Sequence, residues 1–379
     1  MKKLWKRFRR TGAGPATAAR GLLRIALAVA AIVSLVAGSV SPAFALPRPI
    51  KIVVLGDSYA AGNGAGSYQG PQDCFRSRTG WVEQYANGLR AAGYQVTLVN
   101  RACSGARTQD ITNDRVMSSA SYSIPLLGDR RSDEAAARNV LTGLGLCVSP
   151  HPEEERYDVT ATSTFNGLLT TFTFTCTRVL AAQINAVGSD ADVVLMMMGG
   201  NDVHFATLVR ECFVLPSPAT CRASLQQANS LLGGVRQAMT EVLTAVGSRL
   251  NPSAMVGLLS YPYLEKSDDF TLISLLPLDS FRAGEEVRKL GRSGDEIQTS
   301  AVNAANLTLG RSFAHFIGGV KERFAGHEPD GTILLFNLDG WLHEVTTLIP
   351  AEWYHPNPHG HAAYSKLMIE DPRFGPGGL

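Results

Sequence analysis

The first 45 residues of this 379-residue chain lack any acidic side chain. They hold eight basic residues, and an apolar run over residues 25–40 leads to Ala43, Phe44 and Ala45, a small-x-small pattern typical of signal peptide cleavage. The run is short for a membrane span, which needs ~20 apolar residues, so an uncleaved anchor is the weaker interpretation. We therefore predict a secretory signal peptide over residues 1–45 and an extracellular mature protein.

Basic charge is scarce once this segment is removed. The remaining 27 Lys and Arg against 33 Asp and Glu leave a net charge of about −6, in place of the +2 of the whole chain. A basic surface for nucleic acid is therefore not expected. No internal repeat or low-complexity block is visible in the mature chain, and its length is ample for one large α/β domain.

The chain also lacks any C-x-x-C pair, which argues against a zinc or redox motif. An even number of cysteines in an exported protein suggests three disulfides, for which the sequence alone leaves fifteen pairings open. We favour sequential pairing because it closes short local loops between predicted core elements. The pairs would be Cys74 with Cys103, Cys147 with Cys176, and Cys212 with Cys221.

Short apolar runs alternate with stretches of helical periodicity along most of the chain. The predicted strands are residues 51–55, 95–99, 192–198, 255–260 and 332–337, and the predicted helices are residues 81–92, 178–187, 223–249, 294–324 and 359–369. This alternation predicts a five-stranded parallel sheet in a three-layer α/β/α domain. Ligand chemistry is then expected at the carboxyl ends of the strands.

Two segments interrupt the alternation within a domain that we place over residues 46–379. Residues 118–175 are polar in their middle, contain Cys147 and end next to Cys176, which predicts a disulfide-tied insertion. Residues 261–292 form a second insertion, with an apolar run over 270–278. A loop of that length is usually a functional lid or binding element, although packing on the core explains the run equally well. The functional interpretation favours fatty acyl substrates.

Short motifs follow the predicted strands and therefore converge on one edge of the sheet. Ser58 lies in a turn after the first strand, Gly105 follows the second, and Asn201 follows the third within a Gly-Gly-Asn-Asp run. Acyl transfer needs a serine hydroxyl and preorganised N–H donors for the tetrahedral oxyanion. The N–H groups of Ser58 and Gly105 and the side-chain amide of Asn201 would supply those donors.

His355 is the expected general base, and Glu352 three residues earlier could reach its other ring nitrogen and fix its orientation. The order Ser, Glu, His matches an α/β-hydrolase, but here acid and base share one loop. The chain also contains no G-x-S-x-G nucleophile elbow.

On these motifs the chain resembles the SGNH hydrolase, or GDSL esterase/lipase, family. Gly56-Asp57-Ser58 matches its first block, Gly105 the second, Gly200-Asn201-Asp202 the third, and Glu352-x-x-His355-Pro356 the last. The resemblance, strongest to secreted actinobacterial lipases and esterases, implies a flavodoxin-like monomer with three sequential disulfides and no metal. The family usually has Asp at the position of Glu352, and some members use a backbone carbonyl, for which one near Trp353 is the candidate here.

The expected function is therefore secreted hydrolysis of carboxylic esters, with lipid among the candidate substrates, through an acyl-serine intermediate. The alternatives are a polysaccharide O-acetyl esterase, an acyltransferase, and an inactive extracellular binding module. A glycine run over residues 62–66 is similar to a dinucleotide fingerprint, but no acid ends the second strand, so no cofactor is expected. We expect Asp57, Asp202, His359 and His361 to be structural.

Overall fold

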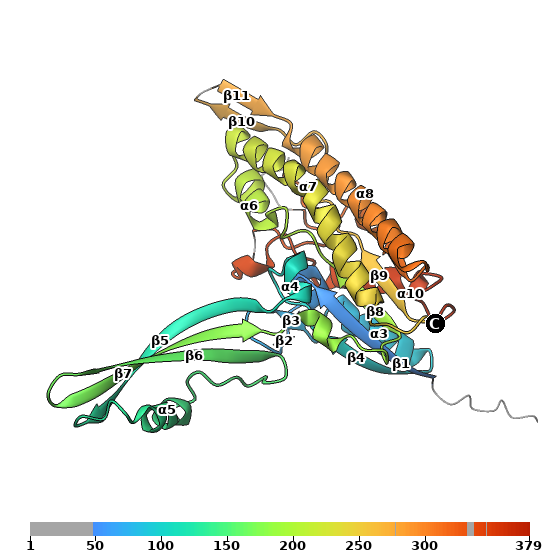
Figure 1. Cartoon of the computed structure of the whole chain (residues 1–379). Coiled ribbons are helices and arrows are strands. Elements are labelled where there is room, and N and C mark those ends of the chain that lie inside the picture. The colour runs from blue at the N-terminus through green and yellow to red at the C-terminus, as the bar shows by residue number, and fades with distance from the viewer. Residues whose placement is uncertain (1–47, 277, 332–336, 346) are drawn as a thin grey trace, which may run out of the picture. The chain divides into compact units, whose positions relative to one another are not determined.

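A computed structural model describes residues 48–276, 278–331, 337–345 and 347–379 (Figure 1). The predicted signal peptide, residues 1–45, lies outside this part of the chain. No helix in the described ranges is long and apolar enough to span a membrane.

Five parallel strands form the central sheet. They are β1 (Arg48–Gly56), β4 (Tyr94–Asn100), β8 (Val193–Met197), β9 (Met255–Leu259) and β12 (Ala314–Ile317). Their order is β12-β9-β8-β1-β4, and each neighbouring pair is parallel. The predicted three-layer α/β/α fold is thus confirmed. The strand order is flavodoxin-like and reverses between β1 and β8, where such folds place their ligands.

Long helices cover both faces of this sheet, which explains why its strands are almost wholly apolar. On β1, Val53 and Leu55 point to one face and Ile52 and Val54 to the other. The first face packs against α7 (Pro218–Gly247) and α8 (Ala283–Leu309). The second packs against α3 (Trp81–Ala91) and α10 (Pro358–Glu370).

The fifth strand is not where the sequence predicted it. The expected helix over 294–324 is broken, because α8 ends at Gly310 with φ 63° and is followed by β12 and then by α9 (Val320–Phe324). Four strand residues between two helical stretches are too few to interrupt a helical pattern visibly. The strand expected at 332–337 falls almost entirely outside the described residues.

The helix expected at 178–187 is also wrong. Its first residues end strand β7 (Leu169–Leu180), and only a short 3₁₀ turn, η1 (Gln183–Ala186), follows. The β-branched and aromatic residues upstream continue the strand into this region.

Residues 118–175 belong to a three-stranded antiparallel arm. It consists of β5 (Arg115–Leu127), β6 (Glu155–Phe165) and β7, in the order β5-β7-β6. Helix α5 (Glu134–Gly143) packs on one face of the arm, where Leu141 meets Phe172 and Phe174. The second insertion, 261–292, contains the hairpin of β10 (Leu272–Leu275) and β11 (Leu278–Phe281) and the start of α8.

The short elements lie mostly at the carboxyl edge of the sheet. They are α2 (Ser58–Ala61), β2 (Tyr68–Gln69), β3 (Arg76–Ser77), α4 (Thr108–Thr112), α6 (Phe205–Val209), the π-helical turn η2 (Arg210–Val214) and the 3₁₀ turn η3 (Pro350–Glu352). The cysteines form the three sequential pairs, Cys74–Cys103, Cys147–Cys176 and Cys212–Cys221.

Candidate active site

The turn that follows β1 is held tightly before the chain reaches Ser58. Gly56 has φ 126°, and a Cβ there would lie 1.9 Å from the Met197 carbonyl oxygen, so only glycine fits. The side-chain amide of Gln183 accepts from the Gly56 N–H at 2.6 Å and donates to the Gly56 carbonyl at 2.9 Å. Asp57 then caps α2 by accepting from the Tyr59 N–H at 3.0 Å. Ser58 therefore begins α2 from a fixed backbone.

Ser58 and His355, 297 residues apart in sequence, are hydrogen-bonded. The Oγ of Ser58 lies 2.6 Å from Nε2 of His355, and both residues are buried. The other ring nitrogen, Nδ1, lies 3.0 Å from the Trp353 carbonyl oxygen. A carbonyl only accepts, so Nδ1 carries the proton and Nε2 keeps a lone pair for the serine hydroxyl. Burial lowers the pKa of His355 to about 4, which keeps the imidazole neutral at pH 7.

Glu352 does not orient His355, which corrects the expectation from sequence. Its buried carboxylate accepts a hydrogen bond from the Tyr68 hydroxyl instead. Tyr68 also accepts from the Gly64 N–H at 3.0 Å, so this contact ties the loop after α2 to the loop that carries His355. The backbone carbonyl of Trp353 occupies the position expected for the acid.

The three expected oxyanion donors line one cleft together with His355. Ser58, Gly105 and Asn201 face a cavity of about 320 Å³. One hydrogen of the Asn201 amide is donated to the Ala106 carbonyl at 2.9 Å, which fixes the amide and leaves its second N–H. The Ser58 N–H is in the first turn of α2, where a helix leaves N–H groups without an intrahelical acceptor.

The loops that carry Gly105 and Asn201 are braced against each other. Asp202 accepts from the Thr108 N–H at 3.1 Å and from its hydroxyl at 2.7 Å. At the base of the arm, Arg115 donates to the Ser104 carbonyl at 2.9 Å. Asp202 therefore acts as the structural brace expected from sequence, although it reaches across to the neighbouring loop.

The family of the chain follows from its similarity to known proteins. The profile of the GDSL-like lipase/acylhydrolase family matches residues 52–368. The chain belongs to this family. It is accordingly a carboxylic ester hydrolase, and Ser58, Gly105, Asn201 and His355 all lie within the matched residues.

Individual relatives of this GDSL hydrolase come from Streptomyces. A lipase of Streptomyces rimosus is 26% identical over 327 residues, which cover 85% of this chain and 87% of the relative. Lipase 1 of Streptomyces coelicolor is 26% identical over 291 residues, covering 72% and 95%.

Solved structures show the same fold. An extracellular lipase from Streptomyces rimosus aligns with a TM-score of 0.50 at 22% identity, and a phospholipase A1 from Streptomyces albidoflavus with a TM-score of 0.50 at 23% identity. Each alignment covers 84% of this chain and 97% of the other.

Several residues that hold this GDSL site were not singled out from sequence. Besides Gln183, the Asn63 amide donates to the Ala351 carbonyl at 2.7 Å, and the Tyr261 hydroxyl donates to Asp57 at 2.5 Å. Burial raises the pKa of Asp57 to about 7, against the lowering effect of the bond from Tyr261. Buried polar side chains on loops far apart in the sequence carry no local sequence signal, so only the fold shows that they meet.

His361 is fully buried beneath the site and makes two backbone contacts. Its Nε2 lies 3.1 Å from the Asn63 carbonyl oxygen, and its Nδ1 accepts from the Trp81 N–H at 3.3 Å. Burial lowers the pKa of His361 to about 4. These contacts fit the structural role expected for it. In the described ranges no group of three or more His, Cys, Asp or Glu side chains is placed to hold a metal ion.

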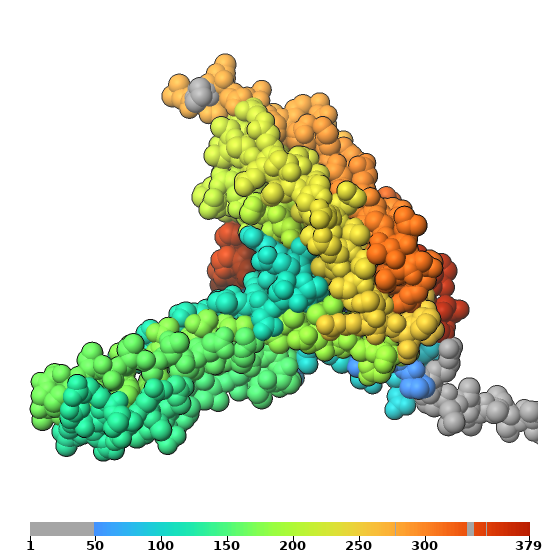
Figure 2. Space-filling view, viewed as in Figure 1, coloured from blue at the N-terminus to red at the C-terminus, as the bar shows by residue number. Residues whose placement is uncertain are grey.

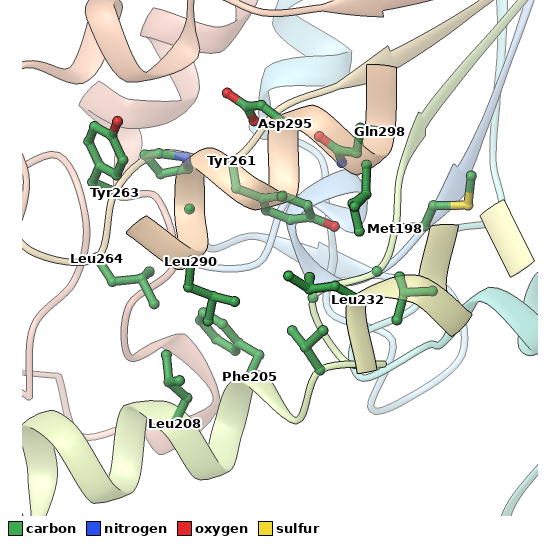
Figure 3. A pocket seen from close by; sticks show the side chains of 18 of the residues that line it. Met198, Phe205, Leu208, Leu232, Tyr261, Tyr263, Leu264, Leu290, Asp295 and Gln298 are labelled. Atoms are coloured by element: carbon green, nitrogen blue, oxygen red, sulfur yellow. The ribbon is translucent and has the colours of Figure 1, made fainter. Parts of the chain in front are cut away.

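A second, more apolar cavity shares Phe205 with the cleft. Its volume is about 120 Å³, and Figure 3 shows Phe205 among the side chains that line it. Phe205 also lines the cleft, and its ring centroid lies 5.8 Å from that of His355. Leu232 of α7 and Leu290 of α8 form part of the wall in the same view. Gly294 on α8 also borders the cavity, and a Cβ there would have no heavy atom within 4 Å.

Proposed function

We propose that this protein is a secreted serine esterase or lipase that works through an acyl-Ser58 intermediate. The supporting observation is the chain of contacts from the Ser58 hydroxyl to Nε2 of His355 and from Nδ1 to the Trp353 carbonyl. A buried serine that faces a neutral imidazole of fixed tautomer is the arrangement that nucleophilic acyl transfer requires.

In the first half-reaction the Ser58 Oγ attacks the ester carbonyl carbon, and its proton passes to Nε2 of His355. The carbonyl oxygen becomes an oxyanion, which the Ser58 and Gly105 N–H groups and the free N–H of Asn201 stabilise. When the C–O bond to the alcohol breaks, the imidazolium gives its proton to the departing oxygen. The products are the free alcohol and acyl-Ser58.

The second half-reaction reverses these roles with water as the nucleophile. His355 takes a proton from water as its oxygen attacks the acyl carbon, and it returns that proton to Ser58 when the acyl–enzyme bond breaks. The carboxylic acid leaves, and the serine hydroxyl is restored. Throughout, the Nδ1–H group of His355 donates a hydrogen bond to the Trp353 carbonyl, which stabilises the transient imidazolium.

Export of the enzyme is supported by the predicted signal peptide and by six cysteines that all pair. Disulfides of this kind are retained in oxidising compartments. One of the similar solved structures is an extracellular lipase.

The central test uses p-nitrophenyl esters and a fluorophosphonate probe on the mature enzyme. Ser58→Ala and His355→Ala should each abolish turnover, and the probe should label the wild type at Ser58 only. Ser119→Ala, on the exposed arm, is the matched control and should behave as wild type. Normal hydrolysis by Ser58→Ala would contradict the mechanism, and failure of the folded wild type to react with the probe would favour an inactive binding module.

A substrate series separates the remaining alternatives. We expect turnover of p-nitrophenyl esters and lipid esters. Activity on acetyl-xylan with none on longer acyl chains would instead indicate a polysaccharide O-acetyl esterase. A new ester as the main product when alcohol is added would indicate an acyltransferase.

A further inference from the structure

Six large aliphatic side chains stand exposed on the β10–β11 hairpin and on two loop segments that carry residues of the cleft. They are Leu215, Ile273, Leu275, Leu276, Leu278 and Leu348, and their exposed fractions range from 68% to 101%. We call this group the apolar rim. Single exposed leucines are ordinary on protein surfaces, but a cluster of them usually marks a binding surface.

Two parts of the apolar rim adjoin cleft-lining residues in the chain. Leu215 follows Val214, and Leu348 comes two residues before Pro350; both Val214 and Pro350 line the cleft. The disulfide Cys212–Cys221 closes the loop that carries Leu215.

Aromatic contacts join the β10–β11 hairpin to these two segments. The Phe213 ring stacks on Phe270 at the base of the hairpin, with centroids 5.8 Å apart, and on Tyr354 next to the catalytic histidine, at 4.9 Å. Figure 2 shows the orange hairpin, the yellow-green segment of α6 and the red segment that contains η3 along one side of the view. The rim is therefore built from neighbouring segments.

The hairpin is anchored at its base and apolar at its tip. Leu272 is buried against α7 and α8, and Arg222 of α7 donates to both carboxylate oxygens of Asp279 at 3.1 Å. Beyond this anchor, the paired residues Leu275 and Leu278 carry the exposed end of the hairpin. The hairpin is thus held at its base, while Leu275 and Leu278 at its tip remain exposed to solvent.

The apolar rim is also free of charge. Residues 212–221, 270–278 and 345–351 contain no Asp, Glu, Lys or Arg, although such residues make up 18% of the chain. The mature protein carries a net charge of about −6. An anionic surface would repel the enzyme as a whole, whereas an interface without net charge complements both the rim and the protein.

We propose that the apolar rim docks the enzyme on a lipid surface of zero net charge, so that the cleft opens onto esters held in that surface. This inference rests on the proposed ester hydrolysis and adds the physical form of the substrate. Leucines at the hairpin tip would enter the interfacial region, as apolar side chains of peripheral proteins do.

The experiment measures co-flotation of the mature enzyme with phosphatidylcholine vesicles. The triple variant Leu275→Ser, Leu276→Ser, Leu278→Ser should lower the vesicle partition coefficient at least tenfold. It should lower the ratio of vesicle-ester turnover to p-nitrophenyl acetate turnover by a similar factor. The matched control is the triple variant Leu127→Ser, Leu144→Ser, Leu307→Ser, which makes the same substitution at three exposed leucines outside the rim. This control should partition as the wild type does.

Added phosphatidylglycerol should weaken binding, because it gives the vesicles negative charge. The proposal is overturned if the wild type does not float, if both triple variants float equally well, or if anionic lipid strengthens binding. It is also overturned if gel filtration shows a rim-dependent dimer that does not bind vesicles. Ser58→Ala distinguishes docking from ester hydrolysis, since this variant should float as the wild type does while hydrolysing nothing.

Discussion

The carbonyl oxygen of Trp353 lies 3.0 Å from Nδ1 of His355, two residues further along the same loop. Tyr354 between them has φ 59°, a left-handed conformation that is uncommon for a non-glycine residue and that curls the backbone back toward the imidazole. The Tyr354 N–H is held by the His343 carbonyl, which stabilises this turn. Orientation of the base is thus a property of the local backbone, and it needs no acidic side chain.

Replacement of Glu352 tests that arrangement. Glu352→Gln should reduce kcat by less than about tenfold, whereas loss of a true orienting carboxylate costs about 10⁴-fold. Tyr68→Phe is the matched variant, because it removes the hydrogen-bond partner of Glu352 without replacing any residue of the loop that carries His355. Both variants should lower the melting temperature while kcat stays within about tenfold of the wild-type value. A loss of three orders of magnitude in Glu352→Gln alone would return the orienting role to the carboxylate.

Removal of the Asn201 amide should act on the transition state. Asn201→Ala should lower kcat by roughly 10²–10³ with little change in KM, because the donor meets the oxyanion and not the ground-state ester. Steady-state kinetics on p-nitrophenyl acetate measure both constants. Ser230→Ala, which replaces an exposed serine on α7, is the control and should leave both constants unchanged. An increase in KM with unchanged kcat would assign Asn201 to substrate binding.

The buried imidazoles predict an unusual response to acid. With the pKa of His355 lowered to about 4, the acidic limb of kcat/KM should fall near pH 4 and not near the ordinary value of about 6.5. Protonation of the buried imidazoles also lowers the stability of the folded protein. Since the unfolded chain binds protons on His355 and His361 more readily than the folded one, the contribution of these two imidazoles to stability is full above about pH 6.5 and is lost as pH falls toward 4.

Rate profiles and thermal unfolding across pH 3.5–8 check both statements. An acidic limb near 6.5, at pH values where the enzyme is fully folded, would contradict the buried, neutral state of His355.

The Cys212–Cys221 disulfide closes a loop of 9 residues beside the cleft. Replacement of both cysteines by serine should destabilise the protein by about 2–3 kcal/mol through the entropy of the unfolded chain. Because Phe213 in this loop stacks on Tyr354, activity should fall together with stability. Urea unfolding and ester kinetics on the double variant measure the two effects, and an unchanged unfolding midpoint would exclude this role.

Replacement of Gly294 should raise stability, unlike loss of the disulfide. It lies inside α8, and a methyl group there meets open space at the edge of the second cavity. Gly294→Ala should therefore stabilise the enzyme by about 0.5–1 kcal/mol, as expected when alanine replaces glycine within a helix. Thermal unfolding measures this gain, and a loss of stability would show that the cavity has less room than its geometry indicates.

The sequence was sufficient to predict which residues meet at the cleft. Ser58, Gly105 and Asn201 each follow a strand of a parallel sheet, and the carboxyl ends of such strands share one edge. The parallel order could be predicted because apolar runs and helical periodicity alternate so regularly. The four strand residues of β12 could not, because a run that short between α8 and α9 has no period of its own.

The supporting contacts could not be predicted for a different reason. Every residue has a carbonyl, so nothing in the sequence marks the one of Trp353 as a hydrogen-bond acceptor for His355. Gln183 lies in a stretch that sequence patterns assigned to a helix, and its role depends on the place where β7 ends. Such contacts follow from tertiary geometry, and a structure is needed to find them.

The arm leaves and re-enters the domain between two contacts with the catalytic loops. Arg115, at its entry, holds the Ser104 carbonyl next to Gly105, and Gln183, just after its exit, clamps Gly56. Near this root, Ser119 and Thr177 are paired across β5 and β7. Evolution could therefore shorten, lengthen or replace the outer parts of the three strands and helix α5, provided that Arg115, Gln183 and Glu154, which forms ion pairs with Arg76 and Arg101, stay in place.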